Sequence, residues 1–553
     1  MVYPKIPLAQ NIIDIALAKG LTNIVISPGS RNAPLTIGFV NNPNFKCYSI
    51  VDERCAGFFA LGIAQQTQKP VALVCTSGSA LLNYYPAFAE AFYSQIPLVV
   101  ISADRPSSKI DIGDGQTIRQ KNVFKNHSLY NANLDQESSS QNDSEICKAI
   151  DCALLQRGPV HINAPFEEPL YETTTEVFRE SLIFDGFDFQ NYTKNEINTF
   201  CIEKWNSSSK KMILAGVNYP NVLSQKNIDF LANDDAVIVL TETTSNLHDN
   251  SFINNIDAII TPFTDLEYEF FRPQILITFG GMIVSKRIKA MLRKYRPEVH
   301  WHIDLHRAYN TFGIDAEHFV MTPDIFFDIL AMKSRQVPSD YFQKMDTIKR
   351  LRLQRTAAYF TKIPFSDFKA FQQIIESLPT QAMFQISNSS AIRYAQLIDI
   401  DPTISVFCNR GTSGIDGSTS TAIGAAVASK NQTIFVTGDI GFIYDSNALW
   451  NNYVPKNFKI IVINNGGGGI FRILPGHAET PVFNEFFETS HCLTCENLAK
   501  MYGLSYGIAS NEKSLNEGLT AMYACNDKPF LLEVFTPTLA NDLILLQFFK
   551  ELL

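Results

Sequence analysis

The sequence predicts an α/β protein made of three consecutive doubly wound domains, each built on a parallel sheet. Many short segments are continuous runs of Val, Ile and Leu, the pattern of strands buried on both faces of a parallel sheet. Stretches with apolar residues at helical spacing separate these runs, so strand and helix alternate. The chain has 553 residues, enough for about three such domains. We place them at residues 1–185, 205–345 and 355–553.

Apolar runs and helical periodicity define the elements of the first block. Residues 6–19 form a predicted helix with one apolar face, and residues 55–65 form a helix of small residues that would pack closely. A further helix is expected from Ser79 through Phe92. The predicted strands are residues 23–27, 47–51, 71–76, 97–102 and 159–162. Residues 170–208 lack clear periodicity and predict a linker.

The same alternation continues in the second and third blocks. Residues 325–353 have charged, helical character and lead from one block to the next. The predicted strands of the second block are residues 211–216, 236–240, 274–279 and 300–305. Those of the third block are residues 384–387, 404–408, 433–437, 458–463 and 530–535. The first and third blocks look like two versions of one plan.

Composition narrows the classes of function. The net charge of −9 disfavours a nucleic-acid partner, although local arginines still permit an anionic substrate. No apolar run reaches about 18 residues, so no membrane span is predicted. The first residues lack a basic segment followed by an apolar core and a cleavage site, so we expect a cytoplasmic protein.

The ten cysteines are scattered, mostly within apolar segments, which predicts buried free thiols. One pair, Cys492 and Cys495, has CxxC spacing and follows His491. A zinc site would need a second ligand pair, and none is near in the sequence. We therefore expect residues 492–502 to form an ordinary helix.

Residues 438–469 read GDIGFIYDSNALWNNYVPKNFKIIVINNGGGG. One predicted strand runs into Gly438-Asp439, and the next runs into Asn464-Asn465 and four glycines. This predicts a βαβ unit with oxygen ligands at the ends of both strands. The Asp439 carboxylate and the Asn465 amide carbonyl suit Mg²⁺, and the glycines let the backbone approach a diphosphate. The alternative is an ordinary βαβ unit with a glycine-rich turn.

The GD pair, the gap and the NN pair resemble the diphosphate-anchoring motif of thiamine-diphosphate enzymes, and the order of the three blocks matches their decarboxylase and synthase superfamily. The resemblance implies a pyrimidine-binding first domain, a central domain and a diphosphate- and metal-binding third domain. It implies thiamine diphosphate with Mg²⁺ or Mn²⁺, the metal being held by Asp439, Asn465 and the Gly467 carbonyl. The residues implied to contact the cofactor are Glu53, Ser413, Ile415, Asp439, Asn465, Gly467, Ile470 and Phe471.

The sequence departs from that family at the glycine run 466–469, where relatives often carry a further Asn and a Gln. Side-chain contacts at Gly466 or Gly469 are therefore not expected. The departure leaves the Gly467 carbonyl available.

Glu53 follows a predicted strand within VDERCAGFFALGIA. A glutamate there could be a solvated surface residue. The resemblance implies instead that it hydrogen-bonds a ring nitrogen of the aminopyrimidine and so activates the cofactor. No other side-chain acid or base is assigned to catalysis.

Four arginines stand at strand or turn ends, where ligands bind in parallel sheets: Arg31, Arg105, Arg393 and Arg410. Each alone could be a surface or salt-bridge residue. Because arginine binds carboxylates bidentately, the four together favour a substrate with several negative charges.

Five longer sequence motifs are more specific for one subfamily: SPGSRNAPLT, ISADRP, GDGQTIRQ, SKR at residues 285–287 and NRGTSGIDG. They resemble the menaquinone-pathway transferases of this superfamily, which decarboxylate 2-oxoglutarate and add the remaining succinyl unit to isochorismate. The resemblance implies a homodimer or homotetramer with active sites at the dimer interface, where the first and third domains meet. The residues implied to line the substrate site are Ser30, Arg31, Arg105, Gln116, Lys286, Arg287, Asn388, Ser389, Arg393, Arg410, Phe471 and Leu474.

Three other functions stay open from the sequence. Another 2-oxoacid decarboxylase or synthase would need fewer arginines. An inactive thiamine-diphosphate-binding scaffold protein would not need Glu53. A Rossmann-type nucleotide protein should carry its glycines directly after a first strand, with an acidic residue about 20 positions on.

Overall fold

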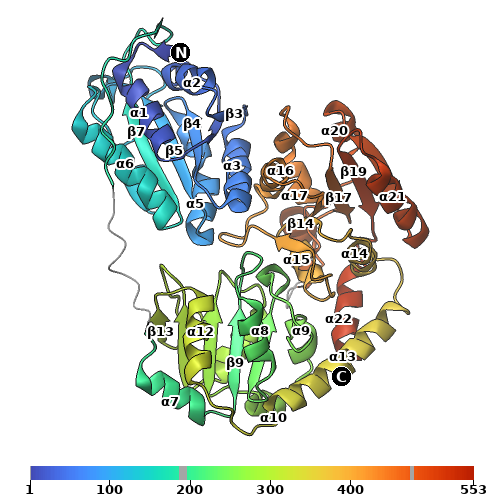
Figure 1. Cartoon of the computed structure of the whole chain (residues 1–553). Coiled ribbons are helices and arrows are strands. Elements are labelled where there is room, and N and C mark those ends of the chain that lie inside the picture. The colour runs from blue at the N-terminus through green and yellow to red at the C-terminus, as the bar shows by residue number, and fades with distance from the viewer. Residues whose placement is uncertain (1, 186–195, 474–478) are drawn as a thin grey trace.

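The computed structural model describes residues 2–185, 196–473 and 479–553. It contains three parallel sheets with helices on both faces, so the predicted fold class is confirmed (Figure 1). In Figure 1 the N-terminal part is blue, the central part is green and the C-terminal part is orange to red. The carboxyl ends of the strands in these sheets position the candidate site.

The first sheet has six parallel strands in the order β3-β2-β4-β5-β7-β6. Its strands are β2 (Asn23–Ile26), β3 (Lys46–Ser49), β4 (Val71–Cys75), β5 (Leu98–Asp104), β6 (Tyr130–Asn133) and β7 (Pro159–Pro165). Its helices are α1 (Pro7–Ala18), α2 (Ala33–Asn41), α3 (Glu53–Thr67), α4 (Ser79–Asn83), α5 (Tyr85–Ser94) and α6 (Ser140–Leu155). The sequence did not indicate β6, a short edge strand with two asparagines in four residues.

The third sheet follows the same plan. Its order is β15-β14-β16-β17-β19-β18, and each strand occupies the place of its counterpart in the first sheet. The strands are β14 (Met383–Ile386), β15 (Ser405–Phe407), β16 (Thr433–Gly438), β17 (Phe458–Asn464), β18 (Ser505–Ala509) and β19 (Phe530–Phe535). The longer helices are α14 (Asp367–Glu376), α16 (Ser418–Ala428), α21 (Glu512–Ala524) and α22 (Asn541–Glu551). The shorter helices are α15 (Ser390–Ala395), α17 (Asp439–Tyr444), α18 (Ile470–Ile473), α19 (Pro481–Phe483) and α20 (Glu496–Met501).

The central sheet has five parallel strands in the order β10-β9-β11-β12-β13. They are β9 (Lys211–Ala215), β10 (Val237–Thr241), β11 (Ile275–Phe279), β12 (Val299–Ile303) and β13 (Ala316–Phe319). Its helices are α7 (Thr199–Ser207), α8 (Gln225–Ala232), α9 (Ile256–Ile260), α10 (Asp265–Phe270), α11 (Lys286–Lys294) and α12 (Pro323–Lys333).

Two local predictions were wrong, and a third stretch is helical as predicted but divided. The stretch 170–208 is not all linker, because Thr173–Thr174 (β8) pairs with Tyr3–Pro4 (β1) and α7 begins at Thr199. Residues 325–353 are mostly helical, as expected, but they belong to two helices: α12 ends at Lys333, and α13 (Tyr341–Phe360) begins after a break that contains Pro338. The helix expected over residues 492–502 begins only at Glu496.

Helix α3 of the first part and helix α16 of the third pack closely against each other (Figure 1). Their glycines permit this approach, because a Cβ on Gly424 would lie 2.0 Å from the Phe59 carbonyl oxygen, and one on Gly62 would lie 2.1 Å from that of Thr421. One hydrophobic cluster contains side chains of both helices, including Phe58, Phe59 and Ile423. The first and third parts therefore share a core.

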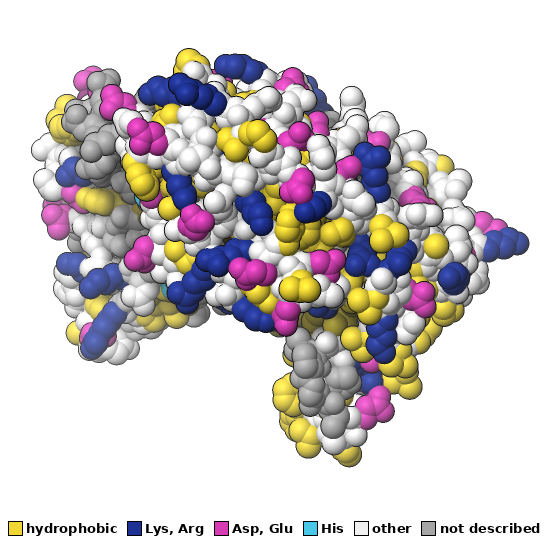
Figure 2. Space-filling model, turned by 90° about the horizontal axis from the view of Figure 1, so that it is seen from below, with side chains coloured by type: hydrophobic (Ala, Val, Ile, Leu, Met, Phe, Trp, Pro, Cys, Tyr) yellow, Lys and Arg dark blue, Asp and Glu magenta, His cyan; other side chains and the backbone are white. Residues whose placement is uncertain are grey.

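Basic and acidic side chains intermingle on the face seen in Figure 2, with hydrophobic ones between them. Such a mixed surface lacks the single-sign field of nucleic-acid-binding faces. None of the helices in the described ranges is long and apolar enough to cross a membrane.

Candidate active site

A cavity of about 350 Å³ lies at the carboxyl ends of β14, β16 and β17. The sheet order reverses between β14 and β16, so this is the crevice where open parallel sheets bind ligands. It brings together most of the residues implied to hold the cofactor. Its lining includes Asp367, Asn388, Ser389, Ile415, Asp439, Asn465, Gly467, Ile470 and Phe471.

The Asp439 carboxylate is buried and fixed by backbone amides. Its Oδ1 accepts from the Ile440 amide at 2.7 Å, and its Oδ2 accepts from the amides of Gly466 and Gly467 at 2.9 and 3.1 Å. Burial raises the pKa of Asp439, while these amides lower it. Because a carboxylate offers about four lone-pair positions, this one retains room to bind a cation.

Asn465 is oriented by a residue that sequence reasoning missed. Its Nδ2 donates to Asp367 Oδ2 at 2.9 Å, which leaves the amide oxygen as the free acceptor. Asp367 is itself held by Thr536 Oγ1 at 2.5 Å and by its own backbone N–H, which donates to Asn541. Burial raises the pKa of Asp367 to about 6. The donors thus fit a hard cation, with Asp367 directing the amide.

The glycine run and His491 complete this corner of the cavity. The Gly467 carbonyl accepts from the Gly469 amide at 3.0 Å and keeps a second lone pair. His491 Nε2 lies 3.4 Å from Asp439 Oδ2, although the sequence had offered His491 only as part of the CxxC stretch. Of that pair, Cys492 is exposed and Cys495 is buried, and the described residues contain no group of three or more His, Cys, Asp or Glu side chains placed to hold a metal.

The apolar wall is formed by residues from two loops. Ile415 and Ile470 line the cavity, and the Phe471 ring packs edge-on against Phe487 at 6.0 Å. Ser413 lies apart from them, exposed and on the wall of a second cavity. Leu474 falls outside the described residues.

The arginines of the second and third parts gather next to this cavity. Arg410 Nη1 donates to Asn388 Oδ1 at 2.7 Å, which joins Arg410 to a residue of the cavity wall. Burial lowers the pKa of Arg393, and the neighbouring Arg410 lowers it further. Two like charges held this close favour a ligand with more than one carboxylate.

Two carboxylates face these arginines, the half-buried Asp257 and the buried Glu242. Asp257, whose pKa is raised by burial, lies near Arg287 and Arg393 and accepts from Ser285 Oγ. Glu242 accepts from the amides of Val284 and Ser285 at 2.7 Å each, and burial raises its pKa to about 7.

Glu242 thereby fixes the start of α11. Lys286 and Arg287 begin this helix and are both exposed, and the Arg287 guanidinium lies 4.5 Å from the centre of the Phe549 ring.

Glu53 lies elsewhere, at the first turn of α3. Asp52 caps this helix by accepting from the Cys55 amide at 3.2 Å, which fixes where Glu53 stands. Glu53 Oε2 accepts from Asn83 Nδ2 at 3.4 Å, and its charge helps to raise the pKa of buried Cys75. Glu53 is not among the described residues that line either cavity.

Ser30, Arg31, Arg105 and Gln116 also lie on the first sheet, at the carboxyl ends of β2, β4 and β5. The buried Arg31 donates to the Phe166 carbonyl at 3.0 Å and to Glu168 at 3.1 Å. Arg105 Nη1 lies 3.4 Å from Asp114, and its Nε is buried without a partner among the described residues. The structure therefore divides most of the implied site between the two terminal sheets, and it places Lys286 and Arg287 at the start of α11 in the central part.

Backbone strain marks three of the implied site residues, two implied to bind substrate and one, Ser413, implied to contact the cofactor. Gln116, Ser389 and Ser413 have φ angles of 58°, 72° and 62°, a left-handed region that costs energy for residues with side chains. Such conformations cluster where a binding site requires a particular backbone path.

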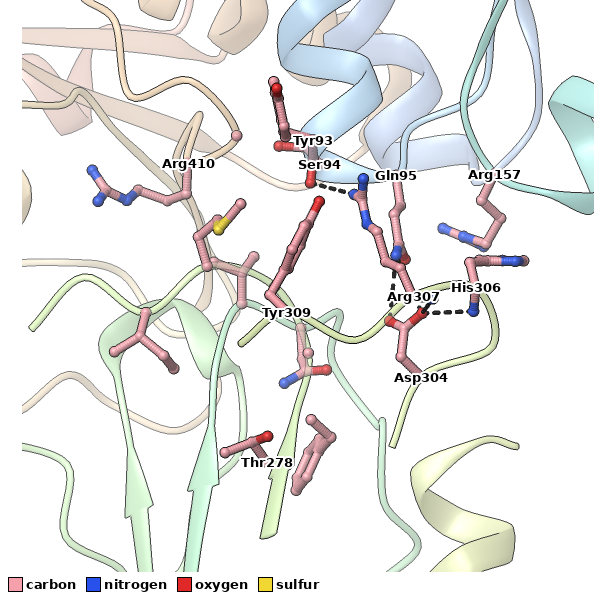
Figure 3. Close-up of a pocket in the computed structure, with 18 of the residues that line it drawn as sticks. Tyr93, Ser94, Gln95, Arg157, Thr278, Asp304, His306, Arg307, Tyr309 and Arg410 are labelled. Carbon is pink, nitrogen blue, oxygen red and sulfur yellow. Dashed lines mark hydrogen bonds between the residues drawn. The ribbon is translucent and has the colours of Figure 1, made fainter. Parts of the chain in front are cut away.

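A second cavity, of about 460 Å³, lies at the carboxyl ends of the central strands β9, β11 and β12 (Figure 3). Asp304, Arg307 and Tyr309 line it from the central part, and Tyr93 and Ser94 from α5. Arg410 borders it as well, but its guanidinium points away from the cavity (Figure 3). Within the described ranges, the loop that carries Arg410 is the one segment that borders both cavities.

Comparisons with known proteins agree with this geometry. A family profile described as the N-terminal TPP binding domain of thiamine pyrophosphate enzymes matches residues 6–131, and the corresponding C-terminal profile matches residues 389–534. The chain is 65% identical, over the full length of both proteins, to a protein of Flavobacterium johnsoniae named 2-succinyl-5-enolpyruvyl-6-hydroxy-3-cyclohexene-1-carboxylate synthase. The chain belongs to this synthase family. Family members of the same name in Flavobacterium psychrophilum and Bacteroides fragilis are 64% and 36% identical, with at least 98% of each chain covered.

Membership of the synthase family settles the class of protein and its cofactor. The chain is an enzyme, and thiamine diphosphate is the cofactor of its two matched domains. The N-terminal matched range contains Glu53, and the C-terminal matched range contains Asp439 and Asn465.

Proposed function

We propose that the enzyme decarboxylates 2-oxoglutarate and adds the succinyl unit to isochorismate, giving 2-succinyl-5-enolpyruvyl-6-hydroxy-3-cyclohexene-1-carboxylate and CO₂ in menaquinone biosynthesis. One observation carries the proposal: a cluster of arginines stands directly beside the cofactor cavity, joined to its wall by the bond from Arg410 to Asn388. Both substrates carry two carboxylates, and a small apolar 2-oxo acid would not need this charge.

The chain's own residues bind and orient the substrates. Arg393 and Arg410 would pair with substrate carboxylates, and Arg31 and Arg105 would do so from the first sheet. Arg287, Lys286, Ser30, Gln116, Asn388 and Ser389 would complete the binding surface. Thiamine diphosphate, when bound, supplies the electron sink for decarboxylation. Phe471 and Ile415 keep the cavity apolar beside it, which strengthens every charged contact inside.

We propose that Mg²⁺ or Mn²⁺ anchors the diphosphate through Asp439, Asn465 and the Gly467 carbonyl. The support is the chemistry of the donors: a fixed carboxylate, an amide oxygen left free by Asp367, and a carbonyl with an open lone pair. Hard oxygen donors suit these ions, and the phosphates would supply further oxygens.

We further propose a homodimer in which each active site is shared by two chains. Residues 1–185 would bind the pyrimidine, residues 355–553 the diphosphate and metal, and residues 205–345 would form the central domain. The support is the division of the site, because Glu53 lines neither described cavity while Asp439 lines the cofactor cavity.

Exposed apolar side chains support the shared site. Val51 and Leu82, near Glu53, expose 42% and 41% of their surface, and Phe487 at the cofactor cavity exposes 51%. A two-fold arrangement would cover both surfaces at once.

A turnover assay tests the proposed reaction. With thiamine diphosphate and Mg²⁺, the enzyme should release CO₂ from 2-oxoglutarate and form the adduct when isochorismate is added. Faster decarboxylation of pyruvate than of 2-oxoglutarate would indicate another 2-oxoacid decarboxylase. Tight cofactor binding without any turnover would indicate a scaffold protein.

A further inference from the structure

Glu90 is a buried carboxylate that no part of the proposed reaction uses. It lies on α5 of the first part and is 1% exposed. Its Oε1 accepts from the Gly411 amide at 2.8 Å and from Ser94 Oγ at 2.6 Å. Its Oε2 accepts from the amide and the hydroxyl of Thr412 at 2.6 and 2.8 Å. Three of these four donors belong to one loop of the third part.

That loop, residues 408–417, carries Arg410. It connects β15 to α16 without regular secondary structure, so its path depends on outside contacts. Arg410 is adjacent to Gly411, and its guanidinium reaches the cofactor cavity through Asn388. The contacts of Glu90 thus fix the backbone immediately after the arginine that faces the substrate.

The loop and α5 pack so closely at Gly411 that the contact with Glu90 tolerates few other residues. A Cβ on Gly411 would lie 2.7 Å from the Glu90 carbonyl oxygen and 2.8 Å from Ser94 Oγ, so only glycine allows the loop to approach α5 this closely. Hydrogen bonds to a carboxylate are stronger than those between neutral groups. Without the carboxylate, loop donors would lose their partner in a partly buried place.

We propose that Glu90 is a positioning residue for substrate binding: it holds the 408–417 loop so that Arg410 presents its guanidinium to a substrate carboxylate. The inference rests on the proposed role of Arg410. It makes substrate affinity depend on a contact between α5 and the third part of the same chain.

The test compares Glu90→Gln with the wild type in steady-state kinetics. A glutamine can accept through one oxygen only, so at least one loop amide loses its acceptor. We expect KM for one carboxylate substrate to rise roughly tenfold, with a smaller change in kcat and a thiamine-diphosphate affinity within about twofold of wild type. Amide hydrogen exchange over residues 408–417 should become faster.

Three further variants make the result decisive. Ser94→Ala removes only the donor within α5 and should keep KM within about twofold of wild type. Gly411→Ala changes the loop side of the same contact, because its added Cβ would push the loop away from α5. It should reproduce the rise in KM, so it decides the question if Glu90→Gln does not fold. In an Arg410→Ala background, Glu90→Gln should add little, because the arginine it positions is gone.

Two results would overturn the proposal. One is an unchanged KM in both Glu90→Gln and Gly411→Ala. The other is faster hydrogen exchange in the loop with normal KM for both substrates. The failure of the proposed function itself looks different, because the wild type would then not turn over 2-oxoglutarate and isochorismate at all.

Discussion

At the scale of single residues, Asp367 decides which way the Asn465 amide faces. Its Oδ2 holds the Asn465 Nδ2 at 2.9 Å, so the amide oxygen stays directed away from it. Replacing a residue that orients a metal ligand typically lowers metal affinity about 10- to 100-fold. Nothing in the local sequence around Asp367 indicated this role, because the residue lies about a hundred positions before Asn465 and outside any motif.

Replacing Asp367 by Asn tests this arrangement. An asparagine can offer its own amide nitrogen to Asn465, so the Asn465 amide loses its single preferred orientation. We expect metal-dependent affinity for thiamine diphosphate to fall about 10- to 100-fold, as measured by titration calorimetry with Mg²⁺. Asp439→Ala serves as the reference and should abolish metal-dependent binding while leaving the fold intact. Unchanged affinity in both variants would remove Asp439 and Asn465 from the metal site.

Arg393 and Arg410 should matter for substrates and not for the cofactor. We expect Arg393→Ala and Arg410→Ala each to lower kcat/KM by an amount equivalent to about 2–5 kcal/mol, because a substrate carboxylate would be left unpaired. Calorimetry should show unchanged affinity for thiamine diphosphate. Nearly normal kcat/KM for both substrates would make these two arginines ordinary surface residues.

Local motifs predicted the residues at strand ends better than those that support them. Asp439 and Asn465 stand directly after strands, so the sequence indicated both. His491 contacts Asp439, and Glu90 contacts the 408–417 loop, through the tertiary fold only. Asp439 lies 52 positions before His491 (491 − 439), and Gly411 lies 321 positions after Glu90, separations that periodicity and spacing do not reveal.

At the scale of elements, the junction of α3 with α17 holds the helix that begins with Glu53. Asp445, directly after α17, accepts from the Ser420 amide at 2.8 Å and lies 3.5 Å from the Arg54 guanidinium. Arg54 also donates to the Tyr444 carbonyl at 3.1 Å. A buried carboxylate therefore ties the first turn of α3 to the third part.

This junction predicts a pH-dependent stability. Burial raises the pKa of Asp445 from 3.8 to about 7, although Ser420 and Arg54 lower it. The folded state thus binds the proton of Asp445 more tightly than the unfolded state does. This proton binding contributes to stability in full below the pKa of Asp445 in the unfolded chain, and the contribution is lost as the pH rises through about 7. Asp445→Asn removes this titration. The stability of the wild type relative to Asp445→Asn should therefore decrease with rising pH in that window, by up to about 1.4 kcal/mol per pH unit.

Urea unfolding of both proteins at mildly acidic and mildly alkaline pH measures this difference. Glu242 and Asp367 also have raised pKa values, but they titrate in both proteins and cancel in the comparison. An identical difference in unfolding midpoint at the two pH values would show that Asp445 does not titrate between them.

Continuous apolar strands were predictable as elements, whereas three of the edge strands were missed. The central strands of each sheet are fully buried, so their Val, Ile and Leu runs are unbroken, as in β4 and β17. The missed strands β6, β13 and β18 are outermost in their sheets and carry polar or exposed residues. Their strand conformation depends on the neighbouring strand rather than on a pattern of their own.

At the scale of the whole molecule, the first and third sheets repeat one strand order and share a core at α3 and α16. The sequence indicated the repeated plan through its matching blocks. It did not indicate that these two parts of one chain would pack together. Nor did it indicate that Glu53 would line neither described cavity in spite of this packing. That relation depends on how the helices α3 and α16 meet in space.

Co-expression of Glu53→Gln with Asp439→Ala tests whether each site is shared between two chains. Each variant alone should be nearly inactive. In a mixed dimer, one site would combine the intact Glu53 of one chain with the intact Asp439 of the other, and the second site would carry both lesions. With random pairing about half of the dimers are mixed, so activity should recover to roughly a quarter of wild type. If each site lay within one chain, every site would carry a lesion, and a mixture as inactive as its parents would sink the shared-site arrangement.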